Sequence, residues 1–238
     1  MNDMSRALTL VIGNKNYSSW SLRPWLLLRQ FGVAFEEVKL PLDEPEFYAR
    51  IGDYSPAGRV PVLIDNGLID SDLVDSDPAS RELHIWDSLA ICEYANECVL
   101  DGRGWPADIS ARARARSISA EMHSGFSALR NALPMNTRKH VPTPALSEDV
   151  RRDVERVKSI WREAREQRSG HGDFLFGPFG IADAMYAPVV LRFVGYAIDL
   201  GPVERRYADA MLALPSLREW LAEAATEPMA PLHEQNIP

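Results

Sequence analysis

Three serine hydroxyls stand close together near the amino end of the chain, in the segment N-Y-S-S-W-S-L-R-P-W-L-L-L at residues 16–28. An apolar, β-rich run at residues 7–12 precedes them and predicts a strand, and the apolar spacing after them predicts a helix. The first turn of a helix has free backbone N–H groups and a partial positive charge, so it stabilises an anion. Ser18 and Ser19 are therefore candidates for binding an anionic ligand.

Pro24 limits where this helix can begin, because proline is tolerated only where its missing N–H would be unpaired anyway. With Ser21 as the N-cap, Pro24 falls in the first turn. Ser18 and Ser19 then remain in the loop, free to face a ligand. The alternative is that these serines only cap the helix, since serine is a favoured cap.

A second helix start carries similar chemistry. Asp87 and Ser88 precede the segment L-A-I-C-E-Y-A-N-E, whose apolar spacing is helical. Asp87 is a natural N-cap, and the Ser88 hydroxyl beside free N–H groups would suit a carboxylate. A plain cap explains the same residues equally well.

A proline stands at the mouth of a very apolar strand expected at residues 59–65. Because proline removes a ladder donor, Pro61 should lie at the start of the strand. A cis Val60–Pro61 bond would leave the backbone N–H and C=O of Val60 free for a ligand. Only about one X–Pro bond in twenty is cis in folded proteins, so the residues alone favour the trans form.

Composition narrows the class of protein. The net charge of −8 argues against nucleic acid and against anionic membrane surfaces as partners. Cys92 and Cys98 form neither a metal motif nor a disulfide framework, which favours reduced thiols and a cytoplasmic location. We expect no secretion signal and no membrane span. The acidic run at residues 70–80 lacks the glycine and terminal glutamate of a calcium loop, so we interpret it as a solvated excursion and predict no metal.

The pattern of elements changes after residues 102–107. Before them, the order strand, helix, strand predicts a parallel unit, followed by a hairpin; after them, the chain is helical throughout. We therefore predict an α/β domain at residues 1–101 and an all-helical domain at residues 107–238. The expected strands are at residues 7–12, 34–40, 59–65 and 82–86, and the expected later helices are at 109–133, 147–168, 181–193, 203–212 and 216–225.

Four residues of the long helix expected at 109–133 lie on adjacent turns and are candidates for a second-substrate pocket: Met122, His123, Phe126 and Arg130. The plainer alternative places Met122 and Phe126 in the core and gives His123 a structural hydrogen bond. Arg130 would neutralise an acidic second substrate.

Four segments together resemble the cytosolic glutathione transferases: S-S-W-S-L-R, R-V-P-V-L, W-D-S-L-A-I and G-I-A-D-A-M-Y-A-P-V-V. The serine loop is most similar to zeta-type and related bacterial members, whose pattern is S-S-C-S. Trp20 replaces that cysteine, which argues against the zeta-type maleylacetoacetate isomerase activity. Gly180 likewise stands where the family usually has a serine or threonine cap, while Asp183 of that capping box is kept.

The resemblance implies a thioredoxin-like amino-terminal domain, an all-helical carboxy-terminal domain, a cis bond before Pro61 and a homodimer. It also implies glutathione as the co-substrate and a small electrophile as the second substrate. Ser18, or Ser19 as a close second, would stabilise the thiolate. Val60 would pair with the cysteinyl backbone, and Asp87 and Ser88 would hold the γ-glutamyl end; the implied glutathione set also includes Trp20, Arg59 and Pro61.

Two functions remain open at this stage. One is an enzyme that conjugates or isomerises electrophiles with glutathione, and the other is a non-catalytic module of the same fold that binds ligands or partners. A thiol–disulfide reductase is disfavoured because the serine loop has no cysteine.

Overall fold

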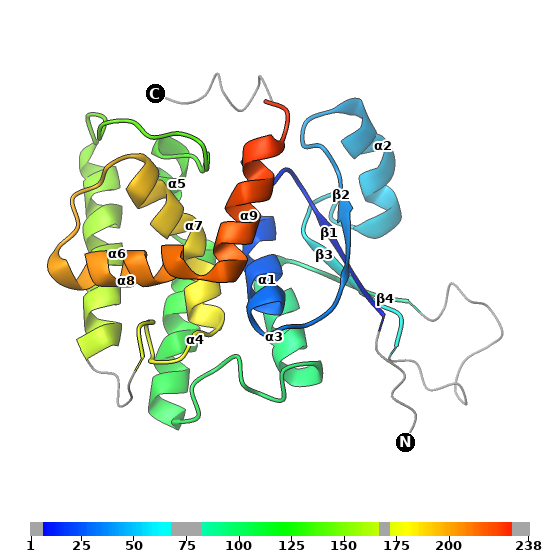
Figure 1. Ribbon diagram of the computed structural model, residues 1–238, viewed down its shortest axis with the longest axis horizontal. Coiled ribbons are helices and arrows are strands. Elements are labelled where there is room, and N and C mark those ends of the chain that lie inside the picture. Colours follow the sequence, from blue (N-terminus) through cyan, green and yellow to red (C-terminus); the bar gives the residue numbers. More distant parts are fainter. Residues whose placement is uncertain (1–6, 68–81, 167–171, 230–238) are drawn as a thin grey trace.

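The computed structural model describes residues 7–67, 82–166 and 172–229 (Figure 1). A four-stranded sheet of order β2-β1-β3-β4 is built from β1 (Leu8–Ile12), β2 (Glu36–Lys39), β3 (Val62–Asp65) and β4 (Leu83–Trp86). β1 pairs with β2 in parallel, whereas β3 is antiparallel to both β1 and β4. The predicted parallel unit and hairpin are confirmed, with each strand shorter than expected. The acidic run at 70–80 and its calcium alternative lie outside the described residues.

The pleat of β1 divides its side chains between two cores, because successive residues of a strand point to opposite faces. Leu10 and Ile12 belong to the large core shared with the helices α1 (Ser19–Gln30) and α3 (Ser88–Cys98). Val11 faces the opposite way, into a smaller cluster under α2 (Pro45–Tyr54). Figure 1 shows the sheet between α2 on one side and the pair α1 and α3 on the other.

The start of α1 corrects the prediction that Ser21 is its N-cap. The N-cap is Ser18, three residues earlier than predicted, and the helix begins at Ser19. The Ser21 hydroxyl is used elsewhere, as the acceptor of the Gly13 N–H at 3.1 Å. Pro24 therefore lies inside the helix, which lacks the bond that an N–H at position 24 would make to the Trp20 carbonyl. At the other end, Gly32 takes a positive φ of 70°, as expected of the residue that ends the helix.

The single long helix predicted at 109–133 is wrong, because the chain breaks there into α4 (Ile109–Ser124) and α5 (Ser127–Ala132). Gly125 ends α4 in an extended conformation, where an added Cβ would lie 2.7 Å from the Glu121 carbonyl oxygen. Phe126 is left-handed, with a φ of 57°, and is buried. Met122 before the break and Leu129 after it both lie in the core, so the spacing of apolar residues did not indicate that the helix ends at Gly125.

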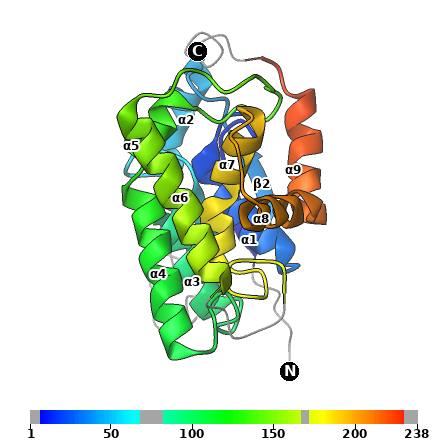
Figure 2. The ribbon, with the colours of Figure 1, turned by 90° about the vertical axis from the view of Figure 1, so that its left-hand side faces the viewer.

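The remaining predicted helices are confirmed as α6 (Glu148–Glu166), α7 (Ile181–Gly195), α8 (Pro202–Ala213) and α9 (Pro215–Thr226). The end of α6 predicted beyond residue 166 falls outside the described residues. Figure 2 shows α4 and α6 side by side, and Arg156 of α6 joins them through two bonds to the Glu121 carboxylate, at 2.8 and 2.9 Å. No helix among the described residues is long and apolar enough to cross a membrane.

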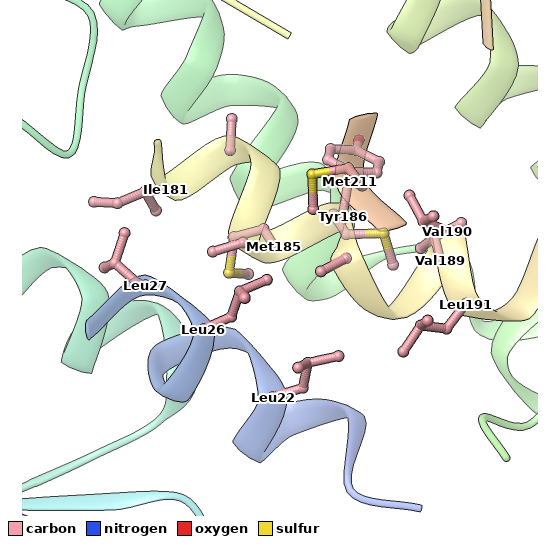
Figure 3. Packing of buried hydrophobic residues seen from close by; sticks show 14 of the residues in the cluster. Leu22, Leu26, Leu27, Ile181, Met185, Tyr186, Val189, Val190, Leu191 and Met211 are labelled. Atoms are coloured by element: carbon pink, nitrogen blue, oxygen red, sulfur yellow. The ribbon is translucent and has the colours of Figure 1, made fainter. Parts of the chain in front are cut away.

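The helix α7 forms the centre of the large core and packs against α1. Leu22, Leu26 and Leu27 of α1 face Met185 and Ile181 of α7 (Figure 3). Asp183 caps the start of α7 by accepting the Gly180 N–H at 2.9 Å, so the weakened capping box keeps its carboxylate half. Because α1 carries the serine loop, this packing fixes the serine loop against the helical part of the chain.

Candidate glutathione-binding site

One cavity of about 320 Å³ gathers most of the residues singled out from the sequence. It lies between the Val60–Pro61 corner, the start of α3 and the α4 side chain of His123. Its wall consists of Trp20, Ala57, Arg59, Val60, Pro61, Trp86, Asp87, Ser88 and His123. Ala57 and Trp86 were not anticipated, although Trp86 directly precedes Asp87 in the sequence.

The start of α3 presents both an acceptor and donors to this cavity. Asp87 is the N-cap, and its Oδ1 accepts the N–H groups of Leu89 and Ala90 at 2.9 and 3.2 Å. The N–H of Ser88 has no partner among the described residues. A helix start with an unused N–H and a hydroxyl suits a carboxylate, while the Asp87 carboxylate suits a cation.

The corner opposite α3 has the backbone form that the resemblance implied. The Val60–Pro61 bond is cis. Neither the N–H nor the C=O of Val60 makes a hydrogen bond within the part of the chain that the structure describes. Arg59, beside it, is exposed. The corner therefore offers a free backbone donor and acceptor to an extended peptide.

The serine loop is close to the cavity but is not part of its wall. Ser18 and Ser19 are 6% and 8% exposed. The Ser18 hydroxyl donates to the Ser21 Oγ at 2.8 Å and accepts the Ser21 N–H at 3.4 Å. A hydroxyl hydrogen rotates freely, so the bond between the two serines reverses without movement of the heavy atoms. In that reversed form the Ser18 proton is available to a ligand.

A buried ionic network holds the loop that precedes these serines. Glu227, just after α9, accepts the N–H groups of Lys15 and Asn16 at 2.9 and 3.0 Å. The fully buried Lys15 ammonium bonds the carboxylates of Glu37 and Glu223. Its ammonium also lies over the rings of Trp25 and Trp220, 4.7 and 5.3 Å from their centroids. The carboxy-terminal helix thereby fixes the loop, a role that no local pattern in the sequence indicates.

His123 connects α4 with the start of α3 across the cavity. Its Nε2 lies 3.0 Å from the Asp87 Oδ2, while its Nδ1 is buried and has no partner among the described residues. Its ring meets the Trp20 ring edge-on, with centroids 5.3 Å apart. Burial lowers the pKa of His123, and Arg23 and Arg130 add to this, although Asp87 opposes them. The imidazole is therefore neutral at pH 7, so it donates from Nε2 to the Asp87 carboxylate.

A buried arginine, Arg23, lies against Trp20, and no pattern in the sequence singled it out. The guanidinium carbon of Arg23 is 4.2 Å from the Trp20 ring centroid, and its Nη1 donates to the Ser88 Oγ at 3.3 Å. Burial, together with repulsion from Arg192 and Arg130, lowers the pKa of Arg23 to about 9. Burial also lowers the pKa of Arg192 to about 10. Positive charge is thus concentrated behind the start of α3.

The other candidates for a second-substrate pocket lie in the core or against Trp20, outside the cavity wall. Met122 is fully buried and Phe126 is 8% exposed, and both belong to the large core, as the alternative interpretation had it. Arg130 of α5 reaches the Trp20 ring at 5.3 Å and donates to the His123 carbonyl oxygen. Of the four, only His123 lines the cavity.

The cysteines, the possible metal ligands and a second cavity were compared with the predictions as well. Cys92 is buried and Cys98 half-buried, and neither is in a disulfide among the described residues. Within residues 7–67, 82–166 and 172–229, no group of three or more His, Cys, Asp or Glu side chains is placed to hold a metal ion. A second cavity of about 300 Å³ lies between the segment from Arg103 to Asp108 and the start of α7.

Comparison with known proteins defines the class. Residues 17–98 match the model of the glutathione S-transferase amino-terminal domain, and residues 147–223 match that of the carboxy-terminal domain. The chain belongs to the glutathione S-transferase family. No curated protein matches it in sequence.

Solved structures give the same fold at low sequence identity. A glutathione transferase homolog from Burkholderia GL BGR1, with bound glutathione, is 23% identical, with a TM-score of 0.64 over 93% of this chain and 100% of that one. A maleylacetoacetate isomerase from Anaeromyxobacter dehalogenans 2CP-1 is 22% identical, with a TM-score of 0.64 over 96% of both chains. Omega 1C transferase from Trametes versicolor is 19% identical, with a TM-score of 0.66 over 92% of this chain and 93% of that one.

Proposed function

We propose that this protein binds glutathione in the cavity between the Val60–Pro61 corner and Asp87–Ser88, and activates its thiol toward a small electrophile. The observation that carries the proposal is the cavity itself, which joins a free backbone edge, a helix start and a carboxylate within about 320 Å³. A tripeptide with an ammonium, two carboxylates and an extended backbone matches these groups. The Burkholderia homolog of the same fold holds glutathione.

Each wall of the cavity takes one part of the tripeptide in this proposal. Val60 pairs its N–H and C=O with the cysteinyl backbone, as in the addition of a short strand. Ser88 donates to the γ-glutamyl α-carboxylate, and Asp87 accepts from the α-ammonium. Arg59 and Trp20 flank the glycyl end and the thiol. Arg130 and His123 face the second substrate.

The chemical step needs an ionised thiol, because the thiolate is the nucleophile and a free cysteine thiol has a pKa of about 8.5. A hydrogen bond from the Ser18 or Ser19 hydroxyl, together with the positive end of α1, stabilises the thiolate and lowers this pKa. The thiol proton passes to solvent, and the sulfur lone pair forms the new bond to the electrophilic carbon. In a substitution the bond from that carbon to the leaving group breaks and the leaving group takes its electron pair; in an addition the π bond of the electrophile breaks and its electron pair moves to the far atom, which then takes up a proton from water. In isomerisation the new carbon–sulfur bond later breaks and releases glutathione.

The test is the ultraviolet absorbance of the bound thiolate as a function of pH. The wild-type protein should lower the pKa of bound glutathione by about one unit or more, which is about 1.4 kcal/mol of differential stabilisation. Ser18→Ala should restore the pKa of the free tripeptide, with Ser19→Ala as the matched control. If only Ser19→Ala loses the lowered thiol pKa, Ser19 is the residue that stabilises the thiolate. An unshifted pKa of bound glutathione in the wild type would contradict the activation step.

A second candidate is a binding module without turnover. The bond between the Ser18 and Ser21 hydroxyls, and the absence of Ser18 from the cavity wall, favour it. Glutathione would then bind with its ordinary thiol pKa in the same titration.

We also propose that the protein forms the homodimer that the resemblance implies. Sedimentation equilibrium would measure this oligomeric state.

A further inference from the structure

We infer that Arg23 is a positioning residue for the carboxylate-binding end of the cavity: it fixes the Ser88 hydroxyl as a donor and supplies a buried positive charge behind it. The inference rests on the proposed function and deepens it. It names the residue that orients Ser88 toward the α-carboxylate placed there under the proposed function. Arg23 itself does not touch the ligand, because it is 1% exposed.

The contact with Ser88 determines which way that hydroxyl points. The Arg23 Nη1 donates to the Ser88 Oγ at 3.3 Å, and a guanidinium has no acceptor. The Ser88 oxygen is thus occupied as an acceptor from one side, and its own hydrogen remains to be donated. Together with the unused Ser88 N–H, the site offers two donors to one anionic group.

No carboxylate in the described part of the chain is bonded to the Arg23 guanidinium, and Asp87 attracts it without forming an ion pair with it. Within the described residues, neither Arg23 nor Arg192 forms an ion pair with a carboxylate: Arg192 donates instead to the carbonyl oxygens of Leu133 and Pro188. The Nε of Arg23 is buried without a partner in the same part of the chain. Buried charges are ordinarily paired, so an unpaired cluster of arginines indicates a partner supplied by a ligand.

The position of Trp20 explains how this charge acts on the cavity without being exposed to it. Trp20 lines the cavity, and the Arg23 guanidinium lies over its ring at 4.2 Å. The indole excludes water from the arginine while its π-face stabilises the cation. In a region of low effective dielectric, the attraction between this charge and an anion at Ser88 is stronger than it would be in water.

The test compares the affinities of two tripeptides by titration calorimetry: glutathione, and γ-aminobutyryl-cysteinylglycine, which lacks only the α-carboxylate. Wild type should bind glutathione at least about tenfold more tightly, because a charge-assisted bond of about 1.4 kcal/mol or more is lost with that group. In Arg23→Gln the two affinities should come within about twofold of each other, through weaker binding of glutathione alone. The matched control is Arg29→Gln, at an exposed arginine of the same helix, which should keep the wild-type ratio.

Two further variants guard against a trivial loss of folding. Arg23→Met removes the charge with a side chain suited to a buried site and should also abolish the preference for glutathione. Arg23→Lys keeps a cation and should restore most of it. An equal loss of both ligands in the neutral variants would show a merely structural role and overturn the inference.

The outcomes also separate this inference from the proposed function. A wild-type protein that binds neither tripeptide, or both equally, would contradict the proposed placement of glutathione and this inference with it. A wild-type preference that persists in Arg23→Gln and Arg23→Met would overturn the inference alone.

Discussion

The helix starts of α1 and α3 share one local design, a polar cap followed by a serine, yet the fold treats them differently. At α1, Ser18 bonds its own first turn, and Glu223 and Glu227, from the carboxy-terminal end of the described chain, hold Lys15 of the preceding loop. At α3, Asp87 caps the helix, but the Ser88 N–H stays unpaired at the wall of a cavity. The comparison shows that what packs against a helix start decides whether its donors serve the fold or a ligand.

The largest effect should come from the network at the α1 side. Glu227→Ala removes the acceptor of two buried N–H groups and an ion partner of Lys39. We expect the free energy of unfolding to fall by about 3 kcal/mol, measured by urea denaturation. Glu219→Ala on α9 breaks only an exposed pair with Arg29 and should change it by less than about 1 kcal/mol. Similar values for both variants would mean that the network does not hold the loop.

A smaller effect is expected at the α3 side. Asp87→Ala removes the cap and places alanine at a φ of 79°, so the free energy of unfolding should fall by about 1–2 kcal/mol. Asp87→Asn keeps a side-chain acceptor for the N–H groups of Leu89 and Ala90, and should lose about half of this or less. Equal losses, measured by the same denaturation, would show that the charge of Asp87 matters rather than its cap.

The smallest effect concerns the pH dependence that His123 brings to the α3 side. Its pKa in the folded state lies below the ordinary value of about 6.5, because burial disfavours the charged ring. As the pH falls below about 6.5, the unfolded state takes up a proton before the folded state does, so stability is lost on acidification. His123→Gln should lose less stability than wild type between about pH 7 and pH 5. Parallel stability curves for the two proteins would refute this.

Many of the helices and strands could be predicted from local sequence patterns. The apolar, β-rich run at β1 and the apolar segment of α7 predicted elements that the structure confirms, because a buried strand and a buried helix require those residues. Asp87 began a helix as predicted, since capping is local, and Gly32, just after the C-cap Phe31, has the positive φ typical of a helix end. Gly125, in contrast, divides a helix whose apolar spacing continues through Phe126, so periodicity alone gave the wrong boundary.

The candidate site was only partly accessible to the same reasoning. Asp87, Ser88 and Val60 were found because caps and prolines have distinct signatures, and the structure brings them to one cavity. Arg23 was passed over because an arginine three residues after Trp20, in a segment with helical spacing, has the pattern of an ordinary exposed helix charge. Its burial beneath Trp20, and the absence of any carboxylate bonded to it within the described residues, depend on neighbours from α5 and α7.

The sequence by itself determined most of the strands and helices, the Asp87 cap and the family, because these depend on residues near one another in the chain. Only the tertiary structure decided which helix start opens to a ligand, since Glu227, Asn16 and Lys15 meet across about two hundred residues of chain. The desolvation of Arg23 and its lack of a bonded carboxylate among the described residues have the same origin. They arise where helices distant in the sequence pack together and exclude water, which no local sequence pattern indicates.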